Sequence, residues 1–117
     1  MRKTYLVNAF SLNMITKFPM TITIDKIDKE EFCLKLELRL EEGELVNAIG
    51  HDSTVKLINA LCGTKLEKNR IEVKMQEGDI ALVVMVSQRL EEGKVLSQEE
   101  IMTMLSEGKI VFYEVML

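Results

Sequence analysis

Short apolar segments separated by polar turns make up most of the chain, and their periodicity predicts the secondary structure. Residues 3–10, KTYLVNAF, are apolar and rich in strand-forming residues, so they predict a buried first strand. Residues 20–25, MTITID, alternate threonine with isoleucine shortly after Pro19, which predicts a half-buried second strand. Residues 109–117, KIVFYEVML, predict a strand at the end of the chain.

Alternating leucines in the first half of the chain predict a hairpin. Apolar side chains occupy every second position from Phe32 to Leu40, with Lys35, Glu37 and Arg39 between them. A strand would gather these apolar side chains on one face, whereas a helix would spread them around its whole circumference. We therefore expect a strand, a turn at EEG and a returning strand to Ile49, although leucine, glutamate and lysine are individually good helix formers.

Two segments carry the start and stop signals of helices. In residues 51–63, HDSTVKLINALCG, Asp52 or Ser53 can cap the first turn, the apolar residues share one face, and Gly63 can close the helix as a left-handed cap. In the second segment, Ser97 and Glu100 have the spacing of a capping box. We expect that helix to end at Gly108.

Between these helices, residues 70–76, RIEVKMQ, and 80–88, IALVVMVSQ, predict two strands joined by a tight turn. The second of them is apolar on both faces, which is typical of a central strand. The elements together predict one α/β domain spanning residues 1–117: a single mixed β-sheet flanked by helices mainly on one face, with an added hairpin.

Composition agrees with one globular domain. The chain has 117 residues, of which 47% are hydrophobic and 29% charged, so it can bury a core. Cys33 and Cys62 form no metal-ligand pattern, and we expect them to be buried free thiols. The apolar run from Ile80 to Val86 is too short for a membrane helix and no secretory signal is evident, so we expect a soluble intracellular protein that does not contact membranes.

The charge of the chain limits its ligands. Nineteen acidic and 15 basic residues give a net charge of −4, which argues against binding long nucleic acid through a broad basic face. A small anion in a local pocket stays possible, because a few N–H groups and arginines suffice to bind phosphate. No glycine-rich phosphate loop and no HExxH or GxSxG motif is present, and we expect neither a metal nor a cofactor.

His51, the only histidine, lies where a predicted strand ends and a helix begins. Amides at a helix N-terminus favour a phosphate, and imidazole suits proton transfer near neutral pH. A capping or surface role is the alternative. Three further charged residues, Arg70, Arg89 and Glu92, lie at or beyond the ends of predicted strands, where sites in α/β sheets form. The alternative is that they are solvated loop charges. The cluster Asn8, Ser11 and Asn13 follows the first strand and suits local capping.

Four stretches together resemble one family along nearly the whole chain, from about Tyr5 to Tyr113. They are YLVNAFSLNM followed by TKFP, AIGHDSTVKLINALCG, KNRIEVKM and VSQRLEEGKVLS. In content and order they are similar to the viral anti-CRISPR ring nucleases of type III CRISPR immunity, found in archaeal viruses. The resemblance implies a homodimer in the host cytoplasm that binds and cleaves cyclic tetra-adenylate, the messenger that activates the host's defence nucleases.

The resemblance also implies roles for single residues. His51 matches the catalytic histidine and Glu92 an important acidic residue, while Arg70 and Arg89 match phosphate-contacting arginines. Asn8, Ser11 and Asn13 match the segment that lines the pocket. The implied reaction is metal-independent attack of a ribose 2′-hydroxyl on its own 3′-phosphate, with His51 as general acid. The alternative is a protein that sequesters a nucleotide messenger, or docks on a host factor, without turnover.

Overall fold

The computed structural model describes residues 3–87, 90 and 96–117, and in this part of the chain it shows one mixed five-stranded sheet with three α-helices. The strand order is β2-β5-β4-β1-β3, and β1 is parallel to both β3 and β4, whereas β5 is antiparallel to β2 and β4. The mixed sheet predicted from the sequence is confirmed. The elements are β1 (Thr4–Val7), the 3₁₀ helix η1 (Leu12–Met14), β2 (Thr23–Ile27), α1 (Lys29–Glu42), β3 (Leu45–Asn47), α2 (Asp52–Cys62), β4 (Ile80–Val86), α3 (Gln98–Ser106) and β5 (Ile110–Met116).

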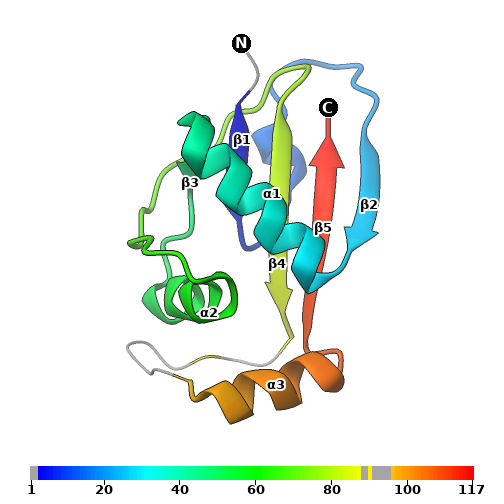
Figure 1. Ribbon diagram of the computed structural model, residues 1–117. Coiled ribbons are helices and arrows are strands. Elements are labelled where there is room, and N and C mark those ends of the chain that lie inside the picture. The colour runs from blue at the N-terminus through cyan, green and yellow to red at the C-terminus, as the bar shows by residue number, and fades with distance from the viewer. Residues whose placement is uncertain (1–2, 88–89, 91–95) are drawn as a thin grey trace.

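The three α-helices pack against one face of the sheet, and α1 crosses that face (Figure 1). The one-sided arrangement agrees with the sequence prediction, which however did not include α1. Under α1, the Phe32 and Phe112 rings lie with their centroids 4.6 Å apart. Lys35 Nζ donates a hydrogen bond to Glu114 Oε1 on β5 at 2.7 Å and lies 3.4 Å from Glu31 Oε2. The hydrogen bond to Glu114 is the main cause that raises the pKa of Lys35. Apolar packing and an ion pair together fix α1 on the sheet.

The opposite face of the sheet is covered by irregular chain and the short 3₁₀ helix η1 instead of α-helices. Tyr5, Val83 and Val115 from the strands form a second core with the buried side chains of Val73 and Met75. The segment 70–76 is therefore not the predicted strand, because the only ladder contact it makes within the described residues is a single bridge between Met75 and Ile15. The alternation of apolar and polar residues in this segment correctly indicated which side chains are buried, but the segment does not pair with a neighbour as a strand. The prediction that β4 is central is confirmed, since it lies between β1 and β5.

The predicted hairpin is the largest error, because residues 29–42 form helix α1. Asp28 caps it by accepting the amide N–H of Glu31 at 2.8 Å, and Gly43 ends it with φ 70°. The leucines do spread around the circumference: Leu36 is fully buried, whereas Leu34 and Leu38 are 57% and 47% exposed. Only the three residues of β3 remain from the expected returning strand.

Cys33 and Cys62 form a disulfide between α1 and α2, so the prediction of free thiols is wrong. Helix α1 places Cys33 beside the end of α2, with a Cα–Cα distance of 5.2 Å.

Removing this disulfide should lower the free energy of unfolding by about 2–4 kcal/mol, because the bond restricts the unfolded chain between positions 29 residues apart. Denaturant unfolding of the oxidised protein and of the Cys33→Ser, Cys62→Ser variant measures the difference. Dithiothreitol should destabilise the oxidised protein and leave the variant unchanged. Equal unfolding free energies for the two proteins would contradict the prediction.

At the other two α-helices, the predicted end of α2 and the predicted start of α3 are confirmed in the structure. Gly63 ends α2 with φ 69°, and Ser97 and Glu100 form a capping box at α3. In the described part of the chain, no helix is long and apolar enough to cross a membrane.

Candidate active site

Several predicted site residues lie at one end of the sheet because three of its strands are parallel. The carboxyl ends of β1, β3 and β4 point the same way, so Asn8, the segment 48–51 and Ser87 follow strands that end at the same edge. Helices α2 and α3 lie at this end too (Figure 1). Ligand sites in α/β sheets form outside the carboxyl ends of parallel strands. The topology thus favours this edge as the functional one.

His51 itself is the N-cap of α2, and this corrects the expectation that Asp52 or Ser53 fills that position. Its Nδ1 accepts the backbone N–H of Thr54 at 3.3 Å and lies 3.0 Å from Thr54 Oγ1. Asp52 instead forms an ion pair with Lys56 at 2.9 Å, and Ser53 is buried. His51 is half-buried at the junction between β3 and α2, as the sequence predicts. Capping and a chemical role are compatible, because capping engages only one nitrogen of the ring.

Arg70 lies directly against Gly50, the residue before His51. A Cβ added to Gly50 would lie 2.8 Å from Arg70 Cβ and 3.0 Å from its Nε, so no side chain fits there. Asn69 fixes this approach, since its backbone N–H donates to Ile49 O and its side-chain amide to Asn47 O, each at 2.8 Å. The backbone and Cβ of Arg70 are thereby held against Gly50, the residue before His51, and the Arg70 side chain is exposed.

Asn47 and Asn69 are supporting residues that the sequence analysis missed. Asn47 Nδ2 donates to Glu67 O at 2.6 Å, and its Oδ1 accepts the N–H of Ile49 at 3.1 Å. These bonds join the end of β3 to irregular segments, which have no periodicity to read. The only available signal was a short amide side chain near the end of a strand, which is common in turns.

The remaining predicted residues are placed less directly. Asn8, Ser11 and Asn13 are exposed, and η1, which begins after Ser11, lies on the face of the sheet opposite the α-helices (Figure 1). Among the described residues, the Ser11 side chain caps no backbone N–H of η1, so local capping does not explain it. Arg89 and Glu92 lie outside the residues that the structure describes.

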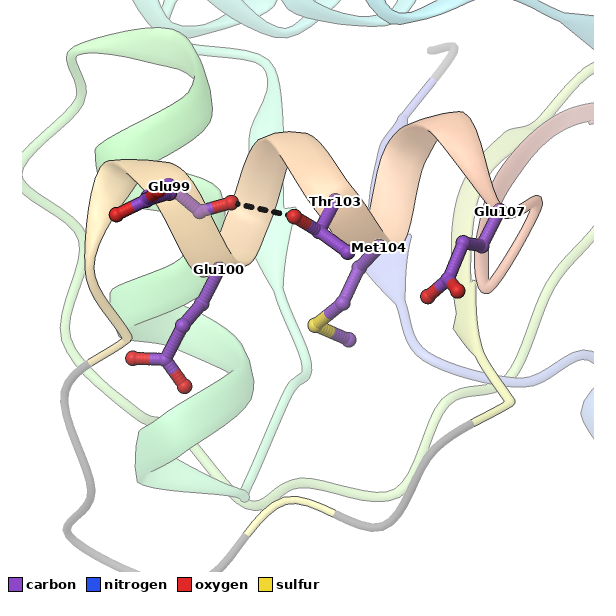
Figure 2. Close-up of a pocket in the computed structure, with 5 residues that line it drawn as sticks. All are labelled: Glu99, Glu100, Thr103, Met104 and Glu107. Atoms are coloured by element: carbon purple, nitrogen blue, oxygen red, sulfur yellow. Dashed lines mark hydrogen bonds between the residues drawn. The ribbon is translucent and has the colours of Figure 1, made fainter.

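A groove of about 330 Å³ on α3 is a poor candidate for a phosphate site. Figure 2 shows that three carboxylates, Glu99, Glu100 and Glu107, line it together with Thr103 and Met104. Thr103 Oγ1 donates to the backbone oxygen of Glu99 at 3.0 Å, so this hydroxyl serves the helix. Clustered carboxylates repel phosphate. Within the described ranges, no three His, Cys, Asp or Glu side chains gather where they could hold a metal ion.

Comparison with known proteins places this geometry in a family. Residues 4–113 match the family described as STIV B116-like. The chain belongs to the STIV B116-like family. The STIV B116-like chain is 69% identical to the solved structure of B116 of Sulfolobus turreted icosahedral virus, with a TM-score of 0.94 and coverage of 98% of this chain and 99% of that one. This likeness confirms the fold.

Two viral relatives extend the STIV B116-like comparison. ORF116 of Acidianus filamentous virus 1 is 47% identical over 110 residues, which cover 94% of this chain and 91% of the relative. ORF117 of Acidianus two-tailed virus is 33% identical over 73 residues, 62% of this chain and 61% of the relative. The sequence prediction of an archaeal-virus protein family is therefore confirmed.

Proposed function

We propose that this STIV B116-like protein is an anti-CRISPR ring nuclease that binds cyclic tetra-adenylate and cleaves it in the host cytoplasm, thereby suppressing type III CRISPR immunity. The motif resemblance supplies the substrate. The observation that carries the proposal is the placement of His51 at the N-terminus of α2 with Arg70 held against Gly50. His51 can transfer a proton and Arg70 carries a positive charge, and both lie near a helix N-terminus, which favours an anion.

The electrostatics at this helix end suit a phosphodiester. The dipole of the 11-residue helix α2 places a partial positive charge at His51, and Arg70 adds a full positive charge. The carboxylate of Asp52 lies in the same turn, but it is paired with Lys56 at 2.9 Å. A phosphodiester oxygen would therefore meet a net attractive field, even though the whole chain carries a charge of −4.

The proposed reaction needs no metal and no cofactor. The ribose 2′-oxygen attacks the adjacent phosphorus in line and gives up its proton to solvent, and the bond to the next 5′-oxygen breaks. His51 gives a proton to that leaving oxygen, and the new end is a 2′,3′-cyclic phosphate. Arg70 and Arg89 stabilise charge on the phosphoryl oxygens, Glu92 orients His51 or the ribose, and Asn8, Ser11 and Asn13 line the pocket. Cuts at two opposite phosphates yield two linear diadenylates.

A homodimer fits both the ligand and the surface of the protein. Cyclic tetra-adenylate is a ring of four equal nucleotides. It can therefore present equivalent phosphates to two identical sites that are related by the two-fold axis of a dimer. On the face away from the α-helices lies an apolar groove of about 300 Å³, beside the segment that contains Asn8 and Ser11. Ile24 and Met85 are 58% and 46% exposed there. The groove is lined by Ala9, Phe10, Ile24, Val83, Met85, Tyr113 and Val115. We assign this face to the second subunit.

Placing a charge in this groove should separate the subunits. Met85→Glu should give a monomer by light scattering after size exclusion, because an unpaired carboxylate would be buried in the interface. Cleavage should fall at least about tenfold, since residues from both subunits would no longer meet one ring. Met102→Glu is the matched control, because Met102 is 60% exposed on α3, away from the groove. A wild-type protein that is a fully active monomer would refute the assignment.

The direct test of function is incubation of the protein with cyclic tetra-adenylate, followed by chromatography. Linear diadenylate with cyclic phosphate ends is expected, in the same amount with and without EDTA. Return of an intact ring from a protein that binds it would show a sequestering module instead. Strong inhibition by EDTA would contradict the metal-independent reaction.

A further inference from the structure

The outer face of α1 carries two exposed leucines that lie outside both core clusters. Leu34 and Leu38 are 57% and 47% exposed, whereas Phe32 and Leu36 of the same helix are fully buried. Residues four positions apart are neighbours on a helix, so these two leucines form one apolar strip. We propose that this α1 leucine strip binds a basic amphipathic helix of another protein. The proposed binding does not depend on ring cleavage.

Helix formation alone does not require leucine at Leu34 and Leu38. Leucine is a good helix former, but glutamate, lysine and glutamine are nearly as good and are fully solvated on an outer face. Adjoining exposed apolar side chains with a polar rim are typical of a surface that another molecule covers. The alternation of leucines that wrongly predicted a strand here is therefore explained by a helix with one face in the core and another available for binding.

Glutamates border the α1 leucine strip and determine the charge of its partner. Glu30 lies four residues before Leu34, and Glu37 three residues after it. Glu41 follows Leu38 by three residues, so all three carboxylates adjoin the strip. They are exposed, and no ion pair within the described residues engages them. Their negative charge is thus available to a positively charged partner.

A basic helix fits this acidic rim better than a second copy of the chain does. Two copies joined through the strip would place carboxylates against carboxylates, and like charges repel. Lysines or arginines beside the apolar residues of a partner helix would instead meet Glu30, Glu37 and Glu41 while the leucines are covered. The apolar groove that we assign to the second subunit lies on the opposite face of the sheet, so the strip would stay accessible in a homodimer (Figure 1).

Fluorescence anisotropy with a labelled synthetic peptide tests the proposed binding. The probe is an amphipathic helix of about 18 residues, with leucines on one face and lysines beside them. It should bind the wild-type protein, and the same peptide with glutamate in place of every lysine should not bind. Binding should weaken severalfold between about 0.05 and 0.5 M salt, because the charges of the rim are screened.

Variants of the strip and of the rim separate apolar contact from charge. Leu34→Gln with Leu38→Gln keeps good helix formers and should weaken peptide binding at least about tenfold, because the apolar contact is lost. The unfolding midpoint should hardly change, since both side chains are exposed. Met102→Gln is the matched control, because Met102 is 60% exposed on α3. Glu37→Gln with Glu41→Gln should weaken binding severalfold and make it less sensitive to salt.

Several results would overturn this assignment of the strip. Equal peptide binding by the wild type and the double leucine variant would mean that charge alone attracts the peptide. Equal binding of the lysine and glutamate peptides would mean that the acidic rim selects nothing. If the double leucine variant changed the oligomeric state in sedimentation without peptide, the strip would contact a second copy of the chain. If it abolished binding to phosphatidylcholine vesicles, the strip would contact lipid instead.

Discussion

Replacing His51 with alanine should lower the rate of cyclic tetra-adenylate cleavage by about 10²–10⁴-fold, the range for loss of a positioned general acid. The same change should destabilise the protein by about 0.5–2 kcal/mol, because it removes the N-cap of α2. His51→Asn separates the two effects. Asparagine is a favoured N-cap residue, so this variant should keep wild-type stability and still lack activity. Single-turnover cleavage and denaturant unfolding measure both quantities.

The contrast between the two variants makes the test specific to chemistry. If lost activity came only from fraying of α2, His51→Asn would cleave almost as fast as the wild type, and the general-acid assignment would be abandoned. Binding of the ring should change little in either variant, since Arg70 supplies the nearby charge. Glu107→Gln is a suitable control, because it changes an exposed carboxylate at the C-terminal cap of α3, outside the site.

The sequence predicted the strand-to-helix junction well because its signals are local. Histidine, aspartate and serine precede an amphipathic run that ends in glycine, and the structure shows a helix over that run. It failed at α1 because the rule of alternation assumes that leucines avoid water. Leu34 and Leu38 violate that assumption, whereas the cap Asp28 and the terminal Gly43 were local signals that favoured a helix. The disulfide was missed for another reason, because the spacing of Cys33 and Cys62 along the chain does not indicate that they pair.

The arrangement of the site was only partly predictable for a different reason. Local signals placed His51 at the end of a strand, but nothing near Arg70 in the sequence indicates that it lies over Gly50. That contact depends on the bonds that Asn69, in an irregular segment, makes to Ile49 and to Asn47 at the end of β3. The resemblance implies that Arg70 is a site residue, and the contact with Gly50 gives that role a physical basis.

Gly50→Ala should therefore damage the site without touching a reacting group. Gly50 is not among the glycines with positive φ, so its requirement comes from space and not from backbone conformation. A Cβ there would lie 2.8 Å from Arg70 Cβ and 3.2 Å from its Cα, which forces the backbone at Arg70 to move. We expect a loss of about 1–3 kcal/mol in unfolding free energy from overpacking. Cleavage should slow about 10²-fold, the effect of a 1 Å misplacement.

A second substitution shows whether the two residues act through this contact. Arg70→Gly removes the Cβ that the new methyl group would meet, so the double variant should regain most of the stability lost in Gly50→Ala. It should not regain activity, because the guanidinium is then absent from the phosphate site. Additive unfolding free energies would mean that Gly50 and Arg70 are independent. Wild-type cleavage by Gly50→Ala would mean that the position of Arg70 beside His51 does not matter for the reaction, and Arg70 would lose its proposed role.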